Sequence, residues 1–439
     1  MPVGPVDMLI TNGTLPDGRT RDVRTEGERI AEIGETLPAR DHERTVDADG
    51  KRLLPGMIDA HVHFREPGFS HKETWRTGSR SAAAGGVTTV VDQPNTEPPT
   101  VDGEAFDEKV ELAERSLVDF GINGGVTSEW LPKILLRRPL FALGEVFLAD
   151  STGDMGIDAD LFAEALAAAA DRDVPVTVHA EDATLFNESA RERDDADAWS
   201  AYRAARAEIE AIERACRVAA EHDTDVHIAH TSTPEGIDTA SDAGMTCEVT
   251  PHHMFLSRDD LPDLGTFGRM NPPLRRENRR RKVFERVADG TVDMIATDHA
   301  PHTREEKDAS IWDAPSGVPG VETALPLLLD EVRRGNLTYE RVRDLTAANP
   351  AEVFGVPEKG YIEEGTHADL VIVDPDDPRE ISGADLHSKC EWTPFEGMEG
   401  IFPELTVVRG TVVYEDRHDE ELFGDAVGAN VRAERGPGR

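Results

Sequence analysis

The chain has 439 residues, of which 87 are acidic and 47 basic, so its formal net charge at pH 7 is −40. Such a charge repels phosphate backbones and anionic lipid surfaces, which excludes nucleic-acid binding and membrane association as main functions. The length is enough for two or three average domains, although α/β barrels often exceed that average as single units.

The acidic residues run through the whole sequence and are not confined to a tail, and only 8 of the basic residues are lysine. This composition is typical of proteins from halophilic organisms with a salt-rich cytosol, where a Debye length of about 3 Å near 1 M salt screens the repulsion between carboxylates. We therefore expect the protein to unfold or lose activity in dilute buffer, which activity assays before and after long dialysis would measure.

The three cysteines, Cys216, Cys247 and Cys390, are far apart and form no CxxC pair. This usage indicates a reduced intracellular protein with buried thiols. The N-terminal segment lacks a basic region followed by an apolar one, and no apolar run approaches about 18 residues. We therefore expect a cytoplasmic protein without a membrane span.

Both ends of the chain have the pattern of short β-strands. Between residues 6 and 54 apolar and polar residues tend to alternate, and Asn-Gly, Glu-Gly and Asp-Gly pairs mark turns, as in β-hairpins. A similar alternating pattern recurs in HADLVIVDP (His367–Pro375) and LTVVRGTVVYED (Leu405–Asp416). We predict that residues 1–54 and 360–439 together form a small β-sandwich domain.

Residues 55–359 have a different pattern, in which apolar strands alternate with amphipathic helices; the clearest helical stretches are 161–173, 204–222 and 278–289. Eight βα repeats with continuous apolar strands predict a closed, TIM-like (β/α)8 barrel. An open doubly wound sheet is the alternative, but no GxGxxG motif opens any of the helices. The candidate strands are residues 56–63, 87–93, 119–126, 141–149, 174–180, 225–230, 245–250 and 292–297.

Polar residues that can bind metals follow these strands repeatedly, and the C-terminal strand ends of a barrel carry its active site. The first strand ends in DAHVHFREPG, and residues i and i+2 of a strand point to the same face about 6 to 7 Å apart. Arg65 follows on that face if the extended conformation continues. Five of these polar residues are predicted to bind metal, which is more than the three protein ligands that one catalytic zinc uses. We therefore expect a two-metal site with a shared water. The predicted metal ligands are His61, His63, His179, His230 and Asp298.

Over nearly its whole length the chain resembles the type I dihydroorotases, within the amidohydrolase superfamily of cyclic amidases. The resemblance is carried by DAHVHFREPG, QPNT, TDHAPH and the closing segments NPAEVFG, GYIEEGTHADLVIVDP and SKCEWTPFEG. It implies a zinc pair inside a TIM-like barrel and a β-sandwich built from both termini. It also implies the reversible cyclisation of N-carbamoyl-L-aspartate to L-dihydroorotate in pyrimidine (UMP) synthesis.

By position, the resemblance assigns Arg65, Asn95 and His302 to the substrate carboxylate. A planar guanidinium suits a carboxylate, and a dianionic substrate entering so acidic a protein needs local positive charge. Asn271, in RMNPPLR, resembles a residue that lines the pyrimidine ring. Allantoinases tend to read HxHFNEPG and DHSPC, so Arg65 and His302 favour a carboxylated substrate.

The chain departs from the better-known family pattern on strand four. Many cyclic amidohydrolases carry there a lysine whose carbamate bridges both metals, whereas this chain has Glu145 in ALGEVFLADSTGD. We predict that Glu145 is the bridging ligand, because a carboxylate needs no modification to bridge. The alternatives are Asp150 or Asp154 from the following loop, since other type I members use a loop aspartate, and a one-zinc site in which Glu145 only packs.

The resemblance implies that hydroxide held between the two ions attacks the ring amide, with Asp298 as general base and then acid. One alternative is another cyclic amidase, an allantoinase or dihydropyrimidinase. A second is a non-catalytic scaffold for aspartate transcarbamoylase, but such chains usually lose metal ligands and this one retains all the recognisable ones. Candidate partners are the small-molecule substrate, a second copy of the chain and aspartate transcarbamoylase.

Three other histidines stand near strand ends. We expect His252 and His253 to pack or to support the site from outside the ligand set. We expect His299 to orient Asp298, because outer contacts commonly fix the ligands of a metal.

Overall fold

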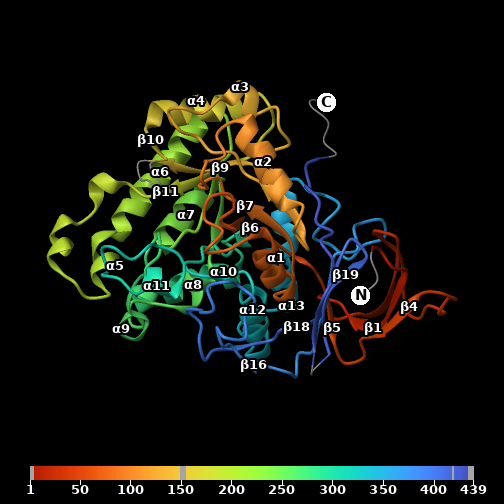
Figure 1. Ribbon diagram of the computed structural model, residues 1–439. Coiled ribbons are helices and arrows are strands. Elements are labelled where there is room, and N and C mark those ends of the chain that lie inside the picture. The colour runs from red at the N-terminus through yellow and green to blue at the C-terminus, as the bar shows by residue number, and fades with distance from the viewer. Residues whose placement is uncertain (1–3, 149–154, 418–419, 434–439) are drawn as a thin grey trace.

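The computed structural model describes residues 4–148, 155–417 and 420–433. Its centre is a ring of eight parallel strands, each paired with the next in chain order (Figure 1). Single parallel bridges join Gly124 to Leu143 and Val62 to His299, which closes the ring and confirms the predicted barrel. The strands are β6 (Met57–Val62), β7 (Val87–Asp92), β8 (Asp119–Ile122), β9 (Leu143–Leu148), β11 (Val176–Ala180), β12 (His227–Ile228), β13 (Thr246–Val249) and β14 (Met294–Ile295).

The barrel strands are buried along almost their whole length, which explains why their residues are mainly apolar. Two of them, β12 and β14, have only two residues each, where the sequence predicts six. Beyond them the backbone leaves the extended conformation, with φ of 34° at His230 and 46° at Asp298. Positive φ is uncommon outside glycine and is concentrated at functional sites. The strands therefore end early where two predicted ligands begin.

Helices follow the strands and cover the outside of the barrel (Figure 1). In α6 the buried residues Ala207, Ala211, Ala215 and Val218 recur at helical spacing and form the face that packs inward. The longer helices are α1 (Trp75–Ala84), α2 (Gly103–Ala113), α4 (Ala159–Ala170), α6 (Ala205–Glu221), α7 (Pro234–Asp242), α10 (Glu277–Asp289) and α12 (Ala324–Arg333). The shorter ones are α3 (Pro132–Leu135), α5 (Ala198–Tyr202), α8 (Pro251–Phe255), α9 (Leu261–Leu264), α11 (Arg304–Lys307), α13 (Tyr339–Arg343) and α14 (Asn349–Val353).

Both ends of the chain meet in one nine-stranded sheet beside the barrel, where the red and blue strands of Figure 1 lie together. The two ends join where β5 pairs antiparallel with β15, and side chains such as Met8, Leu53 and Ile372 form its core. The expected union of the termini is thus confirmed, while the division at residues 54 and 360 stays a prediction. The strands are β1 (Met8–Thr14), β2 (Thr20–Glu26), β3 (Arg29–Gly34), β4 (Arg44–Asp47), β5 (Arg52–Pro55), β15 (Leu370–Val373), β18 (Pro403–Val408), β19 (Thr411–Asp416) and β20 (Glu421–Phe423).

Parts of the C-terminal region contact the barrel itself. The Val431 amide donates to the Phe120 carbonyl, and the Phe120 amide donates to the Ala429 carbonyl, so the end of the described chain runs beside β8. The Ile401 amide donates to the Pro326 carbonyl of α12. Three further short strands are β10 (Gly156–Ile157), which pairs with β9, and β16 (Arg379–Glu380) and β17 (Glu399–Gly400), which pair with each other.

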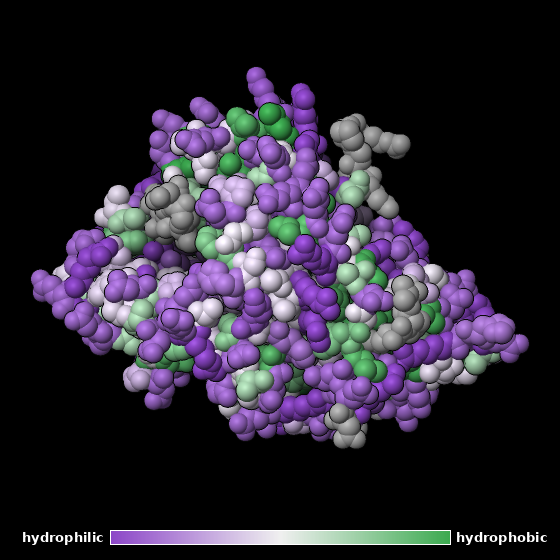
Figure 2. All heavy atoms as spheres, viewed as in Figure 1, coloured by the Kyte–Doolittle hydropathy of each residue, from purple (hydrophilic) through white to green (hydrophobic). Residues whose placement is uncertain are grey.

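The visible face of the molecule is mainly hydrophilic, with small separate apolar areas (Figure 2). This agrees with acidic residues spread along the sequence. Among the described residues, no helix has both the length and the apolar character needed to cross a bilayer.

His387 links the segment just before α12 to β20 and gives the fold a pH-dependent contact. Its Nδ1 lies 2.8 Å from Glu322 Oε1 and its Nε2 lies 3.3 Å from Glu421 Oε2. Burial alone would lower the pKa of His387, but the two carboxylates outweigh it and raise the pKa to about 9. Because the folded pKa exceeds the unfolded value, this stabilisation is present below pH ~6.5 and disappears as the pH rises through about 9.

We therefore expect His387→Gln to lower the free energy of unfolding at pH 6 by roughly 2 kcal/mol and to matter much less at pH 9.5. Denaturant titrations of both proteins at the two pH values, in the same KCl concentration, measure the difference. An equal loss of stability at both pH values would contradict the role of the charged imidazole.

Candidate metal and substrate site

Four buried histidines meet at the C-terminal ends of the barrel strands. His61 lies near the end of β6, His63 follows that strand, His179 lies in β11 and His230 follows β12. The ring centroid of His230 lies 5.2 Å from that of His61 and 4.8 Å from that of His179. None of the four is more than 6% exposed. The fold thus gathers the predicted histidines from three strand ends.

Glu145, on β9, lies between these histidines. Its Oε2 is 2.9 Å from His230 Nε2 and 3.4 Å from His179 Nδ1. Its Oε1 is 3.6 Å from His61 Nε2 and 3.9 Å from His63 Nε2. Each carboxylate oxygen therefore faces a different histidine pair, as a bridging ligand must.

Asp298 closes the cluster from the end of the eighth strand. Its Oδ1 is 2.9 Å from His63 Nε2 and 3.7 Å from His61 Nε2. Burial would raise the pKa of the Asp298 carboxyl, but the neighbouring histidines, His63 first, hold it well below its usual range. An ionised carboxylate therefore faces the same ring nitrogens as Glu145 Oε1.

A group of basic side chains lies beside this cluster. Arg65, 8% exposed, donates from Nε to the Pro301 carbonyl, and its Nη2 is 3.1 Å from His302 Nε2. Lys72 Nζ donates to His302 Nδ1 at 3.1 Å, and His302 Nε2 donates to the Ser316 carbonyl at 2.9 Å. Burial, followed by the positive charge of Arg65, lowers the pKa of His302 to about 3, so the ring is neutral at pH 7.

Arg65 reaches the site by a different route from the one predicted. The extended conformation does not continue to it, because β6 ends at Val62 and Arg65 has a φ of 67°. A turn, rather than the alternation of a strand, brings the guanidinium to the cavity. Lys72 has no counterpart in the sequence prediction, because its contact with His302 joins residues 230 positions apart.

One cavity contains most of the predicted residues. Asn271 lines it and accepts a hydrogen bond from Trp199 Nε1 at 3.0 Å. His61 and His302 lie directly behind its wall, in contact with Glu145 and Arg65. Asp150 and Asp154, the alternative bridging residues, lie outside the described residues. The lining residues are His63, Arg65, Asn95, Glu145, Phe147, His179, His230, Asn271, Asp298, Ala300, Ser316 and Gly317.

The sequence profile of the amidohydrolase family matches residues 52–413. The chain belongs to the amidohydrolase family. It is 65% identical to a dihydroorotase of Halobacterium salinarum over 97% of this chain and 99% of that protein. It is 43% identical to a dihydroorotase of Methanosarcina acetivorans, over 90% of this chain and 89% of that one.

The fold comparison agrees with this assignment. An L-hydantoinase (dihydropyrimidinase) from Arthrobacter aurescens aligns with a TM-score of 0.91 at 29% identity, covering 96% of this chain and 99% of its own. The amidohydrolase family is metal-dependent, and two groups here could each hold an ion: His61, His63 and Glu145, and Glu145, His179 and His230. Imidazole nitrogens with carboxylate oxygens are the donor set that zinc takes in proteins.

The polar atoms of this amidohydrolase fit such an ion. His61 Nε2 is buried and has no hydrogen-bond partner among the described residues, although it points at two carboxylates. A buried polar atom without a partner is costly. A cation at this point would satisfy His61 and offset the close approach of Glu145 and Asp298.

Several residues that the sequence prediction did not include orient the ligands. Glu248, in β13, accepts from His61 Nδ1 at 2.8 Å and lies 3.1 Å from His227 Nε2. Gln93 Oε1 accepts from the Glu145 amide at 2.8 Å. Carboxylates and amides bound to the outer nitrogen fix the tautomer of a metal-binding histidine. A glutamate inside the apolar strand TCEV is the signal that could have identified Glu248.

The side chain of Asn95 has two roles in the site. Its Oδ1 accepts from His63 Nδ1 at 2.8 Å, so the carbonyl of the side chain is already used to orient a predicted ligand. Its amide nitrogen remains the atom that can reach a substrate in the cavity it lines. Asn95 therefore connects the metal-binding group with the substrate-binding group.

The three other histidines near strand ends occupy buried positions. His253 contacts Thr250 Oγ1 and the Pro272 carbonyl, as expected for a packing residue. His299 differs from its prediction, because its Nδ1 accepts from the Gly320 amide at 3.1 Å and its Nε2 faces Glu73 at 3.7 Å rather than Asp298. His299 thus holds the loop after strand eight rather than the carboxylate, because the backbone turn at Asp298 separates the two side chains.

Proposed function

We propose that this amidohydrolase is a dihydroorotase that interconverts N-carbamoyl-L-aspartate and L-dihydroorotate. The observation that carries the proposal is the group formed by buried Arg65 and His302 with the partly exposed Lys72, beside the histidine and carboxylate cluster. Both partners in that reaction carry a carboxylate away from the reacting amide. The similarity to the Halobacterium salinarum dihydroorotase over nearly the full length supports the same assignment.

His61, His63 and Asp298 would hold one zinc ion, His179 and His230 would hold a second, and Glu145 would contribute a carboxylate oxygen to each. When bound, such ions polarise a carbonyl oxygen and lower the pKa of water towards ~7, so that hydroxide is available at neutral pH. Glu248 and Asn95 keep the outer nitrogens of His61 and His63 protonated. The inner nitrogens are therefore free to act as ligands.

Side chains of the site transfer the proton and bind the substrate. Asp298, ionised and within reach of the cluster, takes a proton from the attacking water and passes it to the departing ring nitrogen, as base and then acid. Arg65 binds the substrate carboxylate with a planar guanidinium. Asn95 and Asn271 present polar groups across the cavity. His302 is neutral and lies beside Arg65, so it can help to bind the substrate carboxylate without adding charge.

Turnover by the purified protein, supplied with zinc in concentrated KCl, tests this function. Dihydroorotate, allantoin and dihydrouracil are offered in parallel, and hydrolysis of dihydroorotate alone is the expected result. Preference for either of the other substrates would favour allantoinase or dihydropyrimidinase, whose substrates lack the carboxylate. No turnover of any substrate by zinc-loaded, folded protein would favour a scaffold.

Arg65→Gln is expected to raise KM for dihydroorotate by about 10- to 100-fold while kcat changes little, because one charged hydrogen-bonding group to the substrate is lost. Steady-state kinetics in both directions measure the split. Arg172→Gln, an exposed arginine at the end of α4, is the matched control for loss of one positive charge. An effect on kcat with KM unchanged would contradict the assigned role.

The homodimer, the association with aspartate transcarbamoylase and the cytoplasmic location stay predictions. Size-exclusion chromatography with light scattering in concentrated KCl tests the first. Mixing with the purified transcarbamoylase in the same buffer tests the second.

A further inference from the structure

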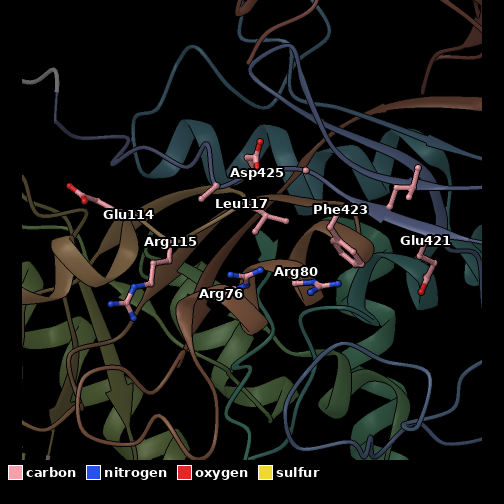
Figure 3. Close-up of a pocket in the computed structure, with 11 residues that line it drawn as sticks. Arg76, Arg80, Glu114, Arg115, Leu117, Glu421, Phe423 and Asp425 are labelled. Carbon is pink, nitrogen blue, oxygen red and sulfur yellow. The ribbon is translucent and has the colours of Figure 1, made fainter. Parts of the chain in front are cut away.

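A second cavity, separate from the proposed catalytic site, lies on the outer side of α1. Its volume is about 630 Å³, within the range of small-molecule sites. Arg76 and Arg80 come from α1, Arg115 follows α2, and Phe423 belongs to β20 (Figure 3). Three arginines therefore gather in one hollow of a chain whose net charge is −40.

Arg76 and Arg80 are four residues apart on one helix, so their guanidinium groups lie on the same face (Figure 3). Like charges at this spacing repel each other. Among the described residues, neither makes an ion pair within 4.0 Å, whereas most arginines of this chain do, as Arg138 does with Asp107. The pair is thus a local excess of positive charge without a described counter-ion.

Arg80 is also held in place. Its guanidinium carbon lies 4.1 Å from the centroid of the Phe423 ring. Its Nε is shielded from solvent and has no hydrogen-bond partner among the described residues. A guanidinium fixed in this way offers its terminal N–H groups to an acceptor with several oxygens, because the fork of N–H groups matches a phosphate or carboxylate.

The three acidic residues that line the cavity, Glu114, Glu421 and Asp425, make no ion pair within 4.0 Å with either arginine. Glu421 contacts Tyr414 and His387. Glu114 points away from the two arginines in Figure 3. Arg115 approaches Glu66 Oε1 at 4.0 Å, at the limit of an ion pair. The floor of the cavity near Arg76 and Arg80 therefore stays positive.

We propose that this cavity binds a small phosphate-bearing molecule, with Arg76 and Arg80 as its main contacts. The phosphate accepts from the terminal N–H groups of the two guanidiniums and offsets the repulsion between them. Leu117 and the Phe423 ring form an apolar wall for an organic portion. Inorganic phosphate and a phosphate ester share this chemistry, so both serve as probes. The inference does not depend on the proposed hydrolytic reaction.

Calorimetric titration of the zinc-loaded protein tests the site, with inorganic phosphate and ribose 5-phosphate as separate probes. The catalytic site is first filled with an equilibrated mixture of dihydroorotate and N-carbamoyl-aspartate. Saturable binding is expected, and Arg76→Gln/Arg80→Gln should weaken it by about tenfold or more, because charged hydrogen bonds dominate oxyanion affinity. Tighter binding of ribose 5-phosphate would identify a phosphate ester, and equal binding would identify free phosphate.

The matched control is Arg172→Gln/Arg217→Gln, which removes two exposed arginines elsewhere and changes the net charge equally. It should bind both probes as the unmodified chain does. Circular dichroism and dihydroorotate turnover confirm that both double variants are folded. Absence of saturable binding by the unmodified protein would overturn the proposal, as would equal losses in the two double variants.

Discussion

Replacing Asp298 by asparagine is expected to lower kcat for dihydroorotate hydrolysis by about 10²- to 10⁴-fold, the usual contribution of a general acid–base group. KM is expected to change only a few-fold, since Asp298 is separate from the Arg65 and His302 group that holds the carboxylate. Asparagine keeps the size of the side chain and one oxygen near His63 Nε2, now 2.9 Å from Asp298 Oδ1. It loses the ability to accept and return a proton.

Three measurements separate this role from a loss of metal or of fold. Kinetics in both directions give kcat and KM, elemental analysis gives the metal content per chain, and thermal unfolding gives stability. Asp263→Asn, an exposed aspartate in α9, is the matched control. An increase in KM with kcat preserved would assign Asp298 to substrate binding. Loss of metal in parallel with activity would assign it to ligation alone.

The elements that could be predicted are those determined by local pattern. Continuous apolar strands that are each followed by polar residues predicted a parallel barrel with its site at one end, and the structure has that ring of strands. The same logic placed His61, His179 and His230 together, because C-terminal ends of parallel strands share one edge. The union of the two termini followed from matching hairpin patterns at both ends.

The parts that could not be predicted depend on where the backbone departs from regular geometry. Arg65 has a positive φ, so its side chain leaves the strand alternation on which its prediction relied. Glu248 and Lys72 act through partners 187 and 230 positions away in the sequence. Such contacts are fixed by closure of the barrel and by loop paths, which no local pattern records.

Replacing Glu145 by glutamine is expected to reduce the metal content from about two ions per chain to about one. The two carboxylate oxygens face different histidine pairs, with Oε2 2.9 Å from His230 Nε2 and Oε1 3.6 Å from His61 Nε2. A carboxamide has a single oxygen acceptor and no charge, so it cannot serve both pairs. Elemental analysis after reconstitution and removal of excess zinc gives the ratio, and activity should fall with it.

Asp150→Asn and Asp154→Asn are the matched comparisons, because those residues are the alternative bridging ligands. Each substitution removes one carboxylate that follows Glu145 closely in the sequence. Each variant protein should keep about two ions per chain if Glu145 is the bridge. Loss of one ion in either aspartate variant, with Glu145→Gln unaffected, would move the bridge to the loop. About one ion in the unmodified protein would favour a one-zinc site.

The geometry also determines which ion Glu145→Gln should lose. His61 and His63 have the Asp298 carboxylate as a candidate third ligand besides Glu145, with Oδ1 3.7 Å and 2.9 Å from their Nε2 atoms. His179 and His230 have only Glu145 within the candidate groups, so their ion depends on it. In a Glu145→Gln background, His179→Asn should leave the metal content at about one, whereas His63→Asn should remove the remaining ion. The opposite order would mean that the two histidine pairs do not bind separate ions on either side of Glu145.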